Sequence, residues 1–165
     1  SFLNLTFPSS HYFFSIKIAQ NNYVFLALMI IFKNHDARTN AINSVKAAFE
    51  IAERNRSINQ SLAKDMGPGM GPIDVNIGIN SGSALVGMTR FTGALDTRMT
   101  YTASGTVTNI AARLSDYAKG GDILIGENTH GLIQGLWPSY SLGRVSLKGL
   151  EAPLQVFSLL RPPGD

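Results

Sequence analysis

The apolar residues of this chain change their spacing across a Gly- and Pro-rich segment, residues 67–72. Before this segment they recur every three or four residues, as in a helix that buries one face. Asp36 or Thr39 can cap this helix, which we expect to run to about Ala63. After the segment, residues 73–79 alternate apolar with polar or small side chains, as in a strand. The chain therefore mixes helix and strand around one loop. The apolar helix positions are Ala41, Ile42, Val45, Ala48, Phe49 and Ala52.

The remaining segments predict a short-element fold. Residues 23–32, YVFLALMIIF, are favoured as a strand buried on both faces over a targeting or membrane segment, because a membrane span needs about 20 residues. Residues 1–22 have no clean period and stay unplaced. We predict an α+β sandwich, ferredoxin-like, with helices packed on a mostly antiparallel sheet. The other predicted elements are strands at 99–103, 123–125, 140–147 and 154–160, an extended segment at 82–87, an exposed loop at 91–97, and helices at 107–117 and 129–136.

Composition limits the classes of protein. With 165 residues, 44% hydrophobic and 15% charged, the chain is expected to form a single folded domain over residues 1–165. It has no cysteine, which excludes disulfides and thiolate metal sites and suits an intracellular location. The formal charge is only +3, without a basic run, so no nucleic-acid partner is expected.

The helix at 107–117 carries the strongest chemical signal. Asn109 and Arg113 stand four residues apart, so both side chains project from one helix face. An amide beside a guanidinium offers several donors to an oxyanion or phosphate. Gly105 precedes the helix and permits close backbone approach to its N-terminal end. The alternative is a surface helix whose Asn and Arg contact only water.

Four linked blocks resemble the catalytic domain of the class III adenylate and guanylate cyclases. They occur in the family's order and cover residues 73–160. They are IDVNIGINSGSALVGMTR (73–90), YTASGTVTNIAARL (101–114), GGDILIGENTHGLI (120–133) and GRVSLKGLEAPLQVFSLL (143–160).

The resemblance implies an enzyme that converts a nucleoside triphosphate, ATP or GTP, to a 3′,5′-cyclic nucleotide and pyrophosphate. Two such domains pair head to tail, as a homodimer or heterodimer. One domain supplies two aspartates that hold Mg²⁺ or Mn²⁺, and the other supplies an Asn and an Arg. Asn109 and Arg113 match the latter pair, with Arg113 at the α-phosphate and Asn109 at the ribose.

Three further residues match the family's nucleotide-binding positions less strictly. Thr102 stands at the base-reading position, three residues before the glycine. Arg98 lies within about one residue of a triphosphate-binding position. Lys148 lies in the last hairpin, although Leu150 replaces the second lysine of the usual LKGK pattern. The alternative for all three is an ordinary strand or loop residue.

The metal aspartates have no counterpart. Aligning residues 29–32 with the family's MAIF-like strand places Phe25, Leu26 and Ala27 on its GDG turn, and leucine cannot bind Mg²⁺. Residues 1–35 contain no Asp or Glu at all. About 22 residues also stand where the family has a strand and two helices. We therefore predict no metal ligands in this chain.

Two functions follow from these departures. The first is a cyclase domain that supplies only the Asn/Arg half of the site and is inactive without a metal-bearing partner. The second is an inactive homologue that acts as a nucleotide-binding, regulatory or dimerisation module, or a truncated fragment, which its start at Ser1 would suit.

Overall fold

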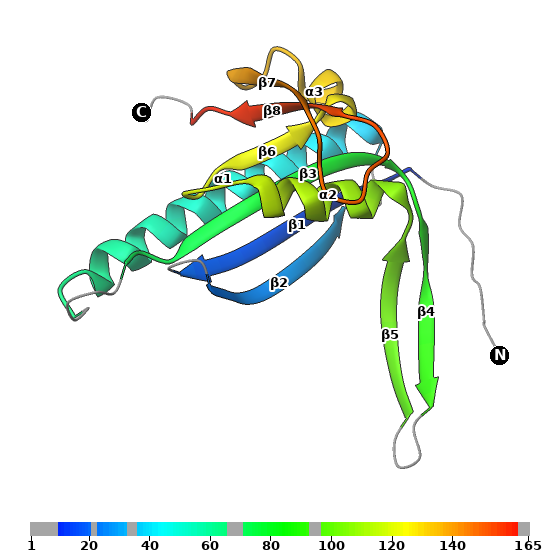
Figure 1. Ribbon diagram of the computed structural model, residues 1–165, viewed down its shortest axis with the longest axis horizontal. Coiled ribbons are helices and arrows are strands. Elements are labelled where there is room, and N and C mark those ends of the chain that lie inside the picture. The colour runs from blue at the N-terminus through cyan, green and yellow to red at the C-terminus, as the bar shows by residue number, and fades with distance from the viewer. Residues whose placement is uncertain (1–9, 21–22, 33–35, 66–70, 93–96, 162–165) are drawn as a thin grey trace.

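Eleven elements make up the computed structural model, which describes residues 10–20, 23–32, 36–65, 71–92 and 97–161 (Figure 1). Eight are strands and three are helices. In chain order they are β1 (Ser10–Gln20), β2 (Tyr23–Phe32), α1 (Ala37–Leu62), β3 (Asp74–Ser83), β4 (Leu85–Thr92), β5 (Thr97–Ser104), α2 (Thr106–Tyr117), β6 (Ile123–Gly126), α3 (Glu127–Ile133), β7 (Ser139–Val145) and β8 (Leu154–Leu159).

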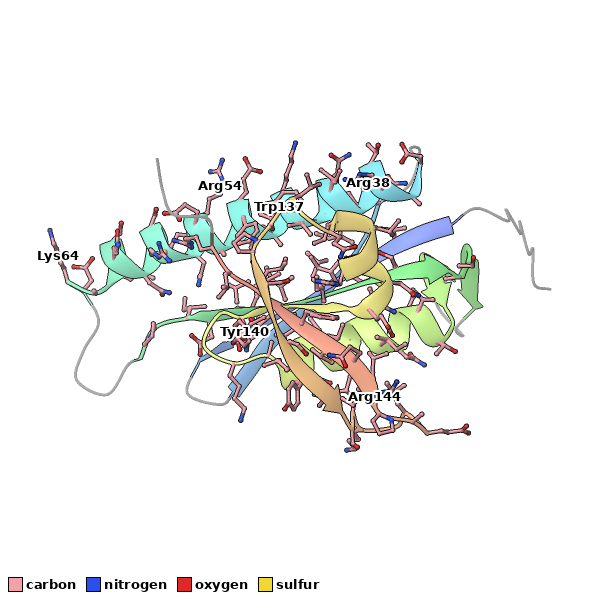
Figure 2. All side chains as sticks on the ribbon, turned by 90° about the horizontal axis from the view of Figure 1, so that it is seen from above. Arg38, Arg54, Lys64, Trp137, Tyr140 and Arg144 are labelled. Carbon is pink, nitrogen blue, oxygen red and sulfur yellow. The ribbon has the colours of Figure 1, made fainter. Side chains whose placement is uncertain are left out.

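Six strands form one sheet in the order β2-β1-β3-β6-β8-β7. Only the β3–β6 pair is parallel, and the other neighbours are antiparallel. Helix α1 lies along one side of this sheet and α2 along the other, as Figure 2 shows from above. The predicted α+β sandwich on a mostly antiparallel sheet is therefore confirmed.

Helix α1 begins after Asp36, the first of the two caps that the sequence offers. The Asp36 carboxylate is its N-cap: Oδ1 accepts a hydrogen bond from the Thr39 backbone N–H at 3.0 Å, and Oδ2 accepts one from the Thr39 hydroxyl at 2.6 Å. These bonds favour the charged form, so the Thr39 hydroxyl, followed by the Thr39 N–H, holds the pKa of Asp36 below its usual value. The helix ends at Leu62 with Ala63 as its C-cap, as predicted.

The two faces of β3 contact different helices. Val75, Ile77 and Ile79 are buried in the main core with Ala41 and Val45 of α1. The opposite face carries Gly78, directly beneath α2. A Cβ at position 78 would overlap the Ala111 carbonyl and lie only 2.5 Å from the Ser115 nitrogen. The glycine of the IGI motif therefore lets α2 pack onto the sheet backbone.

The structure corrects the sequence-based predictions at the β2 edge of this sheet. Residues 10–20 of the unplaced N-terminal segment form β1, between β2 and β3. Residues 23–32 do form a strand, but it is not buried on both faces: β2 lies at the sheet edge, with Leu28 47% and Met29 43% exposed. An apolar run alone does not reveal how many neighbours its strand has.

Strands β4 and β5 form a separate two-stranded hairpin that extends away from the main sheet (Figure 1). The exposed loop predicted at 91–97 is too long, because β4 continues to Thr92 and β5 begins at Thr97. Residues 93–96, and most of the predicted loop at 67–72, lie outside the described residues. In the described part of the chain, no helix combines the length and apolar character needed to cross a membrane.

Candidate functional site

Helix α2 begins at a glycine that the backbone requires. Gly105 is its N-cap and has a backbone φ of 138°, which residues with a Cβ rarely adopt. Its carbonyl accepts hydrogen bonds from the Asn109 N–H at 3.2 Å and the Thr108 hydroxyl at 2.8 Å. This glycine turns the chain from β5 into the first turn of the helix.

The helix buries one face and leaves the other open. Thr108, Ala111, Leu114 and Ser115 are buried toward the sheet. Asn109 is exposed and the Arg113 side chain is 40% exposed, so the structure brings the two onto the outer face, one turn apart. An amide and a guanidinium there are accessible to a ligand or a second protein chain.

The structure adds a residue that the sequence analysis missed. The Asp116 carboxylate Oδ2 lies 3.1 Å from Arg113 Nη1 and accepts its hydrogen bond. The (i, i+3) spacing could have revealed this pair from sequence. This ion pair holds one end of the Arg113 guanidinium and offsets part of its positive charge.

The two predicted nucleotide-binding residues in β5, Thr102 and Arg98, lie near opposite ends of that strand. Thr102 lies near the end of β5, opposite Gly87 in the hairpin. Arg98 lies at the far end of the same strand, seven residues before Gly105, or about 23 Å along an extended chain. The backbone therefore does not bring Arg98 to α2 within this chain.

Lys148 lies in the exposed turn that connects β7 with β8. Its neighbour Leu147 is buried in a cluster with Leu114 of α2 and Leu124 of β6. This contact holds the turn beside α2, and Figure 1 shows the connection passing in front of that helix. The turn that carries Lys148 is thus anchored near α2 through the neighbouring Leu147.

In the part of the chain that the structure describes, strands β1 and β2 do not offer the two carboxylates that the family's pair of metal ions requires. Phe25–Ala27, which the alignment placed on the metal-binding turn, lie inside β2, so that placement is wrong; β1 and β2 are joined through residues 21–22. Neither strand contains a carboxylate. Across the described ranges, no group of three His, Cys, Asp or Glu residues is placed to hold an ion. Mg²⁺ prefers oxygen donors such as the carboxylates of Asp and Glu.

Comparisons with known proteins identify the class. Residues 10–160 match the sequence profile of the adenylate and guanylate cyclase catalytic domain, and the chain belongs to this family. The resemblance read from the sequence is therefore confirmed. A search of curated protein sequences finds no match.

Solved structures share the fold along nearly the whole chain. The adenylyl cyclase CyaB from P. aeruginosa superposes with a TM-score of 0.81 at 20% identity, covering 96% of this chain and 97% of that one. The guanylyl cyclase Cya2 gives 0.70 at 16% identity, with 93% of each chain covered. The guanylate cyclase domain of RhGC from Catenaria anguillulae, in complex with GTP, gives 0.65 at 18% identity, covering 93% and 96%.

Proposed function

We propose that this chain supplies the Asn/Arg half of a nucleotide cyclase active site and needs a partner domain that supplies the metal-binding half. The observation that carries the proposal is the outer face of α2. Asn109 and Arg113 stand there one turn apart, on a helix whose inner face is packed tightly against β3. The family match over residues 10–160 is the reason for interpreting this pair as the Asn and Arg of a cyclase active site.

The chemistry of the pair suits a nucleoside triphosphate. Cyclisation gathers negative charge on the phosphoryl oxygens, and a positioned guanidinium stabilises that charge. Arg113 would contact the α-phosphate, with Asn109 hydrogen-bonded to the ribose. The proposed substrate, ATP or GTP, is supported by the family match and by the GTP in the RhGC structure.

The partner is required by what strands β1 and β2 lack. Mg²⁺ or Mn²⁺ serves the family's reaction, and neither strand of this chain offers a carboxylate to hold it. A homodimer of this chain would lack these carboxylates in β1 and β2 of both copies. A heterodimer with a metal-competent cyclase domain would combine the two halves.

Mixing experiments test this proposal. The full chain is combined with a cyclase domain that keeps its metal aspartates but lacks its own Asn and Arg, and cyclic nucleotide formation from ATP and GTP is measured with Mn²⁺. We expect turnover only in the mixture, and loss of it with Arg113→Ala. Arg144→Ala, at an exposed position on β7, is the matched control and should keep the activity.

Two results would contradict it. Turnover by the purified chain alone would show that it holds its own metal ions. A mixture that assembles without turnover would favour the second function, an inactive nucleotide-binding or dimerisation module.

A further inference from the structure

A cavity of about 430 Å³ lies on the α1 side of the sheet, away from Asn109 and Arg113. Its walls come from the C-terminal half of α1, the chain entering β3, the Gly120-Gly121 turn and Arg161 after β8. A volume of this size suits a small organic molecule. Because α2 covers the other side of the sheet, an occupant would not compete with a ligand on the outer face of α2.

One edge of the cavity carries excess positive charge. Arg56 of α1 and Arg161 both face the same Glu53 oxygen, Oε2, at 3.6 and 2.9 Å from their Nη1 atoms. Two guanidiniums thus share one carboxylate, which leaves a net charge of +1. Each guanidinium keeps further N–H donors in a planar fork, the geometry that binds a carboxylate or phosphate. Arg161 is the less exposed of the two, with 35% of its side chain accessible.

A second wall is held rigid by side-chain amides. Asn55 Nδ2 and Asn59 Nδ2 both donate to the Ile73 carbonyl at 2.9 Å, and Asn59 Oδ1 accepts the Ile73 N–H at 2.9 Å. Each amide nitrogen has a second proton that this carbonyl does not use. The wall therefore offers donors whose positions are fixed before any ligand arrives.

The third wall is the Gly120-Gly121 turn, whose residues have no side chains to narrow the cavity. Gly120 and Gly121 have φ values of 60° and 87°, and a Cβ on either would meet nothing within 4 Å. The Gly121 N–H donates to the buried Asn76 side chain at 3.0 Å, which fixes the turn to β3. The cavity is thus open on the side of this turn, whose backbone is hydrogen-bonded to β3.

We propose that this cavity binds a small organic anion with one carboxylate or phosphate group and an apolar ring or chain. The anionic group would lie on Arg56 and Arg161, with the apolar part on Ala52 and Val75, which also line the cavity. Asp74, which also lines the cavity, offsets part of the positive charge of Arg56 and Arg161 and disfavours a second anionic group. The proposal is independent of the cyclase half-site.

Titrations of the full chain, followed by the backbone amide NMR signals, test the site. The probes are benzoate, phenyl phosphate, inorganic phosphate and benzyl alcohol, so that the anionic and apolar parts are separated and the two anionic groups are compared. We expect saturable shifts at Ile73 and Gly121 with benzoate or phenyl phosphate, and weaker or no binding of the other two. Whichever anion binds more tightly identifies the ligand class.

Four variants decide the result. Arg161→Gln and Arg56→Gln should each weaken binding about tenfold, and Arg161→Lys should weaken it less because the charge remains. Arg54→Gln removes an exposed charge of the same helix outside the cavity (Figure 2) and should change nothing. Failure to saturate, or equal weakening by Arg54→Gln, would overturn the proposal.

Discussion

The Arg113 guanidinium on the outer face of α2 is paired with the Asp116 carboxylate, whose Oδ2 lies 3.1 Å from Nη1. Both side chains are close to half exposed, at 40% and 47%. The proposed phosphate-binding cation thus already has an anionic neighbour. A triphosphate that binds Arg113 must share it with Asp116.

The first prediction concerns this competition. Asp116→Asn removes the negative charge while keeping the shape, so the chain should bind ATP or GTP about two- to fivefold more tightly, the range of an exposed ion pair. Calorimetric titration at low and high salt measures the change, and high salt should reduce it. Weaker binding would mean instead that Asp116 positions the guanidinium for the ligand.

The second prediction concerns the contact between β3 and α2. Gly78→Ala places a methyl group against the Ala111 carbonyl and 2.7 Å from the Leu114 Cβ, so the free energy of unfolding should fall by about 2–4 kcal/mol. Urea denaturation measures it. The same substitution at Gly131, in α3, meets nothing within 4 Å and should stabilise the chain by about 0.5–1 kcal/mol. An unchanged stability of the Gly78 variant would contradict the packing described.

The third prediction concerns pH and the cap of α1. The pKa of Asp36 is lowered in the folded chain, so its stabilising contribution is present above the unfolded pKa, near 3.9, and is lost as pH falls through the folded value. Asp36→Ala should therefore destabilise the chain at pH 7 by more than it does near pH 2. Thermal unfolding at both pH values measures this difference.

Asp36→Asn is the control for the cap. An amide oxygen still accepts the Thr39 N–H but does not titrate, so this variant should keep most of the neutral-pH stability. A destabilisation by Asp36→Ala that is the same at both pH values would exclude an ionised cap.

The fourth prediction concerns the edge strand β2. Met29 is 43% exposed on a strand that lies at the end of the six-stranded sheet, an arrangement that favours association with other chains. Met29→Lys should reduce light scattering on heating without a large change in stability. Ile31→Lys, at a position packed against the cluster around Ala111, should instead destabilise the fold. Unchanged scattering by the Met29 variant would place aggregation elsewhere.

Local patterns predicted the elements whose partners lie nearby in sequence. A helix cap at Asp36 or Thr39, a helix end near Ala63 and the strand at 73–79 follow from backbone preference and spacing, which act over a few residues. The pattern for 23–32 also gave the strand itself. The prediction that this strand is buried on both faces was wrong, because burial depends on which strands lie alongside, and β2 has a neighbour, β1, on one side only.

The candidate site divides in the same way. The spacing of Asn109 and Arg113 placed both on one helix face, since helix geometry alone sets that relationship. The sequence did not show that the turn carrying Lys148 is anchored near α2, because that relationship arises from Leu147, which shares a buried cluster with Leu114. Nor did it show Arg98 at the far end of the hairpin, which depends on the pairing of β4 with β5.

By itself, the sequence determined the family, the Asn/Arg pair and the absence of acidic residues before Asp36, because residue identity and short spacing are enough for each. Only the tertiary structure decided what surrounds them. It paired β1 with β2, packed α2 against Gly78, and brought Arg56 and Arg161 to one carboxylate. These relationships join residues far apart in the chain, and packing of the whole fold, not local preference, sets their distances.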